Sequence, residues 1–219
     1  MTKLNPPSGI YDLSGLHHDG EPYNGTLDIS DDGDAYLLSW QMQGRDATRN
    51  TMFSGVGFVT GNLLVAGRSP INFPPLPSVG VVVYDISKKG TLPARWYHNN
   101  LKGKLGQGLS TEGPSDSLTG TYVAEYGSQN EEFTPLRKEV ITHGKGFHFR
   151  WLQGQETMFI GVGFSLGLSM FCAWGTPRQE IDVLVYQVSR NGELDSEWCA
   201  LSGDGANFGT ESAVLRSRS

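Results

Sequence analysis

The sequence of 219 residues has little of what builds helical, membrane-spanning or nucleic-acid-binding proteins. Runs of Ala, Leu, Glu and Lys are few, whereas 29 Gly, 11 Pro and 23 aromatic residues favour short strands joined by tight turns. Lys and Arg (17) are outnumbered by Asp and Glu (23), so we expect no basic face and no nucleic-acid partner. Residues 1–7 hold no apolar run of signal-peptide length and no run in the chain reaches membrane-spanning length, so we expect a soluble, cytoplasmic protein without a membrane partner.

Cysteine is also scarce. The two thiols, Cys172 and Cys199, both fall in the second half of the chain. In the strand order expected below they lie two strands apart, about 9 to 10 Å, which is too far for an undistorted disulfide. The sequence therefore predicts two free, partly buried thiols, in agreement with a reducing compartment.

What the chain does have is an internal repeat. The stretch Gly55-Val56-Gly57-Phe58 returns as Gly161-Val162-Gly163-Phe164. Landmark residues on both sides pair at constant separations: 111 for Tyr11/Tyr122 and Trp40/Trp151, 102 for Tyr84/Tyr186 and Trp96/Trp198, and 99 for Thr111-Glu112/Thr210-Glu211. Because the separation changes at few places, the length differences are confined to loops, and the repeat defines the architecture.

Each repeat holds about eight short segments of strand character within roughly 100 residues. The sequence predicts an all-β fold of two tandem homologous repeats, each of about eight antiparallel strands forming a small meander barrel, over residues 1–113 and 120–219. Closure would hide the edge strands. A single barrel, or a two-sheet sandwich built jointly by both repeats, is the alternative.

Strand alternation separates two faces of the segment that holds Trp40 and of its copy around Trp151. If the aromatic face lines the barrel, His148 and Arg150 point to solvent or to the other repeat. If the faces are reversed, both line a pocket. The glycines of the repeated motif face away from its Val and Phe, and glycines within a strand mark a bend or a close approach by another group.

The sequence holds few motifs that could bind a cofactor or a metal ion or act in acid/base catalysis. The glycines of residues 55–61 lack the spacing, the helix and the βαβ unit of a dinucleotide site, so we expect no cofactor. His17-His18-Asp19 is better explained as a solvated loop than as a metal site. Glu112 and Glu211 could form half of an acid/base pair or grip a ligand. We favour a latch that bonds turn amides or an Arg at the barrel end, so that Glu112→Gln would lower stability.

No nucleophile elbow, catalytic triad, zinc pattern or P-loop is present, so an enzyme has little support. Tryptophan and tyrosine within a small barrel commonly fill its core, and they also suit a binding pocket. The insert over residues 68–78 would add an exposed apolar patch that needs a partner, a lid role or a dimer contact. The candidate ligand-binding residues are Trp40, Phe73, Tyr84, Trp96, His148, Arg150, Trp151, Tyr186 and Trp198.

In length, strand count and Trp/Tyr placement each half resembles small barrels of the streptavidin or calycin kind. The tandem GVGF, Trp, Tyr and Thr-Glu pattern is similar to two-repeat β proteins that accompany peptide natural-product pathways such as crocagin biosynthesis. The resemblance implies a non-catalytic accessory protein that binds a precursor peptide for pathway enzymes, and it carries over no binding residue. A peptide or small apolar ligand is therefore the expected partner. The alternatives are a cofactor-free barrel isomerase or cyclase and a structural protein that forms a homodimer through the insert around Phe73.

Overall fold

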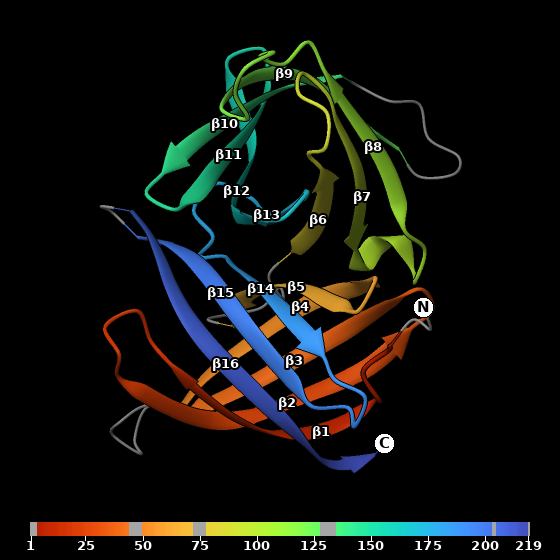
Figure 1. The fold of residues 1–219 in the computed structure, drawn as a ribbon, viewed down its shortest axis with the longest axis vertical. Coiled ribbons are helices and arrows are strands. Elements are labelled where there is room, and N and C mark those ends of the chain that lie inside the picture. Colours follow the sequence, from red (N-terminus) through yellow and green to blue (C-terminus); the bar gives the residue numbers. More distant parts are fainter. Residues whose placement is uncertain (1–3, 44–49, 72–77, 128–134, 203–204, 219) are drawn as a thin grey trace.

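Two closed antiparallel barrels, each of eight strands, make up the computed structural model of the chain, which describes residues 4–43, 50–71, 78–127, 135–202 and 205–218 (Figure 1). Barrel A is formed by β1 (Gly9–Leu16), β2 (Pro22–Asp32), β3 (Ala35–Gln43), β4 (Asn50–Thr60), β5 (Leu63–Pro70), β14 (Asp182–Val188), β15 (Leu194–Ser202) and β16 (Gly205–Arg218). Barrel B is formed by β6 (Val79–Asp85), β7 (Leu92–His98), β8 (Gly106–Thr111), β9 (Gly120–Gly127), β10 (Leu136–His143), β11 (Gly146–Gln153), β12 (Glu156–Leu166) and β13 (Ser169–Gly175). One turn of 3-10 helix, η1 (Asn99–Leu101), follows β7. The prediction of an all-β fold with two eight-stranded barrels is confirmed.

The barrels do not coincide with the repeats, which corrects the expectation that residues 1–113 and 120–219 each close a barrel of their own. Each repeat contributes its first five strands to one barrel and its last three to the other. The chain crosses after β5 and again after β13, so β5 pairs with β14 and β13 pairs with β6. Because the repeats are homologous, β6–β8 and β14–β16 can form equivalent hydrogen-bond ladders with either barrel, so the exchange costs little free energy.

The repeated GVGF motif lies where the two barrels meet. Its Val and Phe side chains face outward into an apolar layer between the barrels, which joins Val56 and Phe58 of β4 to Val162 and Phe164 of β12. Its glycines face inward: a Cβ on Gly55 would clash with a backbone carbonyl of β5 and lie 2.9 Å from the Trp40 ring. The predicted close approach is therefore confirmed, and the motif is structural.

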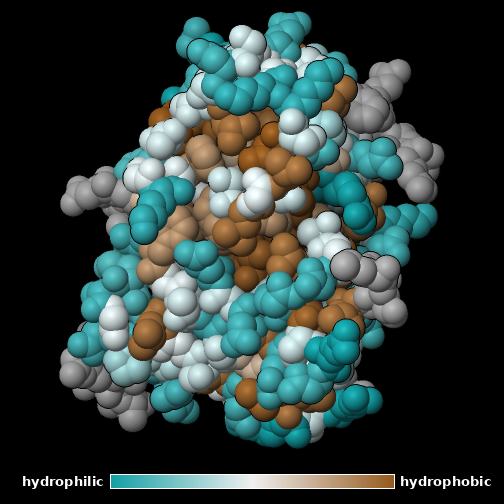
Figure 2. Space-filling view, viewed as in Figure 1, coloured by the Kyte–Doolittle hydropathy of each residue, from teal (hydrophilic) through white to brown (hydrophobic). Residues whose placement is uncertain are grey.

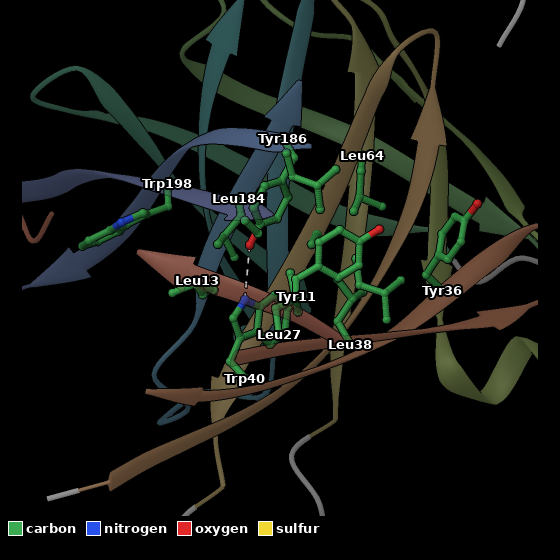
Figure 3. Close-up of a cluster of buried hydrophobic side chains, with 14 of the residues drawn as sticks. Tyr11, Leu13, Leu27, Tyr36, Leu38, Trp40, Leu64, Leu184, Tyr186 and Trp198 are labelled. Carbon is green, nitrogen blue, oxygen red and sulfur yellow. Dashed lines mark hydrogen bonds between the residues drawn. The ribbon is translucent and has the colours of Figure 1, made fainter. Parts of the chain in front are cut away.

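The interior of barrel A is filled (Figure 3). Tyr11, Leu27, Trp40 and Tyr186 are all fully buried there, and Trp40 Nε1 donates a hydrogen bond to the Tyr186 hydroxyl at 3.2 Å. This places the aromatic face of the third strand inside the barrel and so decides between the two orientations that strand alternation left open.

Both cysteines are free, as predicted, and both are fully rather than partly buried. They belong to different barrels, because strand exchange separates β13 from β15. Cys172 lies inside barrel B, and Cys199 lies in the layer between the barrels. Burial raises the pKa of both thiols, which keeps them protonated and unreactive near neutral pH.

Among the residues that the structure describes, none belongs to a helix of the length and apolar character needed to cross a membrane.

Candidate functional site

A pocket of about 360 Å³ lies at the end of barrel B where β6, β10 and β12 begin. It is lined by Ser78, Val82, Trp96, His98, Asn100, Tyr126, Leu136, Trp151, Phe159 and Trp174. Seen from one side, hydrophobic side chains gather over the middle of this barrel and hydrophilic ones frame them (Figure 2). The volume falls within the range of about 300–1,000 Å³ that small-molecule sites occupy.

Five aromatic rings from five different strands form the walls. Neighbouring rings stand steeply to one another: Trp96 and Trp174 at 64° with centroids 6.3 Å apart, Phe159 and Trp174 at 75° and 5.1 Å, and Trp96 and Tyr126 at 87° and 6.3 Å. Tyr126 and Trp151 meet at 61°. Edge-to-face contacts of this kind orient the rings as the sides of a box rather than as a stack.

The rings are held in place by hydrogen bonds. Trp151 Nε1 donates to the Tyr126 hydroxyl at 2.9 Å, which lies 2.8 Å from the Tyr84 hydroxyl. Trp96 Nε1 donates to the Gln107 carbonyl at 3.1 Å. The pocket walls are thereby fixed before any ligand arrives, which lowers the entropy cost of binding.

Glycines behind the rings add to this support. A Cβ on Gly80, Gly106 or Gly108 would collide with the ring of Trp174, Trp96 or Tyr126, respectively. These positions need glycine because each ring lies directly against the backbone.

Three polar residues, Ser78, His98 and Asn100, interact with one another in the lining. His98 Nε2 lies 2.5 Å from Ser78 Oγ, and its Nδ1 lies 2.7 Å from Asn100 Oδ1. The imidazole also stacks on Trp174 at 5.3 Å. Burial lowers the pKa of His98 and outweighs the opposing effect of Asn100, so the ring is neutral at pH 7. No Asp, Glu, Lys or Arg is found among the described residues of the lining.

A buried lysine lies in the barrel interior with Tyr84. Lys138 is fully buried, its Nζ donates to Ser110 Oγ at 2.7 Å, and it lies 4.0 Å and 5.0 Å from the ring centres of Tyr84 and Tyr122. Burial lowers the pKa of Lys138 to about 7. The side chain does not line the pocket.

The corresponding end of barrel A is closed by an ionic network. Arg68 Nη1 contacts Glu211 Oε2 at 3.1 Å and Arg68 Nε contacts Asp182 Oδ2 at 2.8 Å. Glu211 also accepts hydrogen bonds from Tyr23 at 2.9 Å, from Trp40 at 3.1 Å and from Tyr186. Burial alone would lower the pKa of Arg68, but the two carboxylates outweigh it and raise the pKa.

Strand register gives the barrel B counterpart of each member of this network. Arg68 pairs with Gly55 and Asp182, whereas Trp174 pairs with Gly161 and Gly80. Leu92 and Leu194 are matched residues of the two repeats, and they pair with Ser110 and Ala213, respectively. Gly108 and Glu211 each lie two residues before these partners, so they occupy equivalent positions. The triad Asp182, Arg68 and Glu211 of barrel A is therefore replaced by Gly80, Trp174 and Gly108 in barrel B.

The nine residues predicted from the sequence fall into several places. Trp96 and Trp151 line the pocket, and Tyr84 hydrogen-bonds to its wall. Trp40, Tyr186 and Trp198 belong to the filled interior of barrel A.

The other three predicted residues do not line the pocket. Arg150 bonds to Glu139 at 3.2 Å and to Thr157 at 3.1 Å, with its side chain 39% exposed. His148, on the same face of β11, is half-buried, and its pKa is lowered by burial and by Arg150. Phe73 lies outside the described residues.

Sequence reasoning missed Tyr126, Phe159 and Trp174. A signal for Trp174 was available, because it stands thirteen residues after the first glycine of its GVGF motif, as Arg68 does. An exchange of arginine for tryptophan at a matched position marks a difference in chemistry between the two copies.

The two glutamates also differ. Glu211 is a latch of the expected kind, since it pairs with Arg68 inside barrel A. Glu112 is exposed, with a left-handed backbone (φ 59°), so the latch interpretation is wrong for it. The His17 imidazole packs 4.6 Å from Tyr23, and no cluster of three or more potential metal ligands occurs in the described part of the chain.

No known protein-family model matches the chain, and no curated protein is significantly similar to it.

Proposed function

We propose that the protein is a non-catalytic binding protein, and that barrel B holds a small ligand or a side chain of a peptide in its aromatic pocket. The observation that carries the proposal is the pocket of about 360 Å³, walled by five aromatic rings that are fixed before binding. An accessory role, in which the protein delivers a bound peptide to modifying enzymes, is consistent with this geometry.

The interior of barrel A supports the proposal that the ligand binds in barrel B alone. Its equivalent end holds Arg68, Asp182 and Glu211 in direct contact, so its interior is stabilised by internal contacts rather than left available for a ligand. The strand exchange ties the two barrels together, and barrel A then serves as a rigid base for barrel B.

A barrel isomerase or cyclase would need a titratable group in contact with its substrate. Lys138 has the lowered pKa that such a role requires, but it is fully buried and does not line the pocket. This favours binding over catalysis.

Native mass spectrometry of the purified protein, before and after incubation with the peptide and low-mass fraction of its source cells, tests the proposal. We expect a retained adduct that is lost in Trp96→Ala and kept in Trp198→Ala, the matched substitution in barrel A. No adduct with the wild-type protein, or an adduct lost equally in both variants, would argue against a binding site in barrel B.

A further inference from the structure

We infer that the group that enters the pocket is a methylated ammonium cation, an inference that rests on the proposed binding role of barrel B. The starting point is that barrel A already holds a cation at the equivalent site. The Arg68 guanidinium carbon lies 5.7, 4.7 and 5.9 Å from the ring centres of Trp40, Phe53 and Trp198. These distances are those of cation–π contacts.

Barrel B retains all three rings. Register places Trp151 opposite Phe159, as Trp40 lies opposite Phe53, and it places Trp96 opposite Gly106, as Trp198 lies opposite Gly209. What barrel B lacks is the cation, because Trp174 occupies the position of Arg68 and contributes a further ring. Barrel B therefore keeps the three rings, adds the Trp174 ring beside Phe159 and Trp96, and holds a pocket that these rings line.

The loss of the carboxylates decides which cation fits. Gly80 and Gly108 replace Asp182 and Glu211, so the described lining offers no anionic acceptor. A guanidinium or a primary ammonium would lose hydration there and leave its N–H groups unpaired. A quaternary ammonium has no N–H groups, its charge is spread over methyl groups, and aromatic faces replace its weak hydration.

The described lining of the pocket carries no positive charge of its own. Among the described residues that line the pocket none is cationic, and His98 is neutral because burial lowers its pKa. The net charge of −6 adds a long-range attraction for cations. The volume of about 360 Å³ exceeds what a trimethylammonium head needs, and Ser78 and Asn100 can bind a polar group attached to it.

Isothermal titration of the full-length protein with choline and with 3,3-dimethylbutan-1-ol, its uncharged isostere, tests the inference. Both have the same shape, so any difference in affinity reports the charge. We expect choline to bind at least tenfold more tightly, and Trp174→Leu to weaken choline binding at least fivefold. Arg150→Met, which removes a partly exposed cation outside the pocket, serves as the control and should leave choline binding unchanged. Equal affinity for the two probes, tighter binding of the alcohol, or no binding of either would overturn the inference.

A second arm distinguishes the source of the cation. A short peptide that contains trimethyllysine is compared with its unmodified-lysine version and with choline. Tighter binding of the trimethylated peptide than of choline supports a peptide ligand, and the reverse supports a small molecule; both require the methylated cation. Equal binding of the modified and unmodified peptides would contradict it. The proposed binding function fails separately, since it falls only if native mass spectrometry finds no adduct dependent on Trp96.

Discussion

The two barrels share a fold and a set of aromatic rings, but one end of barrel A holds an ionic network, whereas the equivalent end of barrel B holds a pocket. In barrel A, Arg68 bridges Glu211 and Asp182 beneath Trp40 and Trp198. In barrel B the matched positions carry Trp174 and two glycines, and a pocket is found there. Three substitutions at the end of a duplicated barrel thus distinguish an end that holds an ionic network from an end that holds a pocket.

The two barrels also differ in how the charged side chains inside them are paired. Barrel A buries charges only as a compensated set, because an isolated buried charge is strongly destabilising. Barrel B buries Lys138 with only Ser110 and the rings of Tyr84 and Tyr122 as partners. Register pairs Tyr122 with Lys138 and Tyr11 with Leu27, so barrel A has an apolar residue at the position of the lysine.

The largest expected effect is the disruption of the ionic network of barrel A. Arg68→Met leaves the buried Glu211 without its countercharge, so we expect the free energy of unfolding to fall by about 3–5 kcal/mol. Chemical denaturation measures this change. Arg150→Met, which breaks a partly exposed pair with Glu139, is the matched control and should cost less than about 1 kcal/mol. Similar losses in the two variants would show that burial does not distinguish the pairs.

The next largest loss of stability is expected when the arginine of barrel A is introduced at the equivalent position of barrel B. Trp174→Arg places a guanidinium among the pocket rings without a carboxylate, and we expect a loss of stability of about 3 kcal/mol. Adding Gly80→Asp recreates the contact between Arg68 and Asp182, which measures 2.8 Å in barrel A. Because Trp174→Arg removes the ring that a Cβ at position 80 would meet, the Gly80→Asp/Trp174→Arg variant should be about 1–2 kcal/mol more stable in chemical denaturation than its uncharged control, Gly80→Asn/Trp174→Arg. Equal stability of the two double variants would mean that the two barrel ends are not interchangeable.

A smaller and pH-dependent effect belongs to Lys138. Its pKa is lowered to about 7 in the folded state, below its ordinary value of 10.5, so the unfolded state binds more protons between these values. The stability of the wild-type protein should therefore rise with pH through this window, by about 1–2 kcal/mol between pH 7 and 9.

Lys138→Leu, which copies Leu27 of barrel A, removes this cost. We expect the variant to be about 2 kcal/mol more stable than wild type at pH 7, with the advantage shrinking as the pH rises. Denaturation curves at pH 7, 8 and 9 measure it. The mirror substitution Leu27→Lys should destabilise barrel A. An advantage that does not change with pH would show that Lys138 is charged throughout.

The sequence was sufficient for the strands and for the repeat, but it left open whether the rings of Trp40 and Trp151 face into the barrels. Alternation and turn residues report local structure, and both copies agree on them. The exchange of β6–β8 and β14–β16 could not be predicted, because homologous strands make the same ladder with either barrel. The pocket depends on three residues far apart in sequence, and only strand pairing brings Gly80, Gly108 and Trp174 to the same barrel.

The last strand of each repeat shows that residues identical in sequence can occupy different structural positions. The pairs Thr111-Glu112 and Thr210-Glu211 are identical in sequence, yet register relates Ser110 to Ala213, a separation of 103 rather than 99. Continued by two residues, this register makes Leu215, and not Glu211, the counterpart of Glu112. The stability loss that the sequence predicted for Glu112→Gln is therefore no longer expected.

The smallest effect comes from that correction. Glu112 is exposed with φ 59°, a conformation that glycine adopts without strain, so Glu112→Gly should stabilise the protein by about 0.5–1 kcal/mol. Glu112→Ala and Glu112→Gln keep a Cβ in the left-handed region and should change stability by less than about 0.5 kcal/mol. Thermal denaturation of the three variants beside Glu211→Gln separates the two glutamates, because Glu211→Gln removes the charge that balances Arg68. A loss for Glu112→Gln as large as that for Glu211→Gln would restore the latch in both barrels.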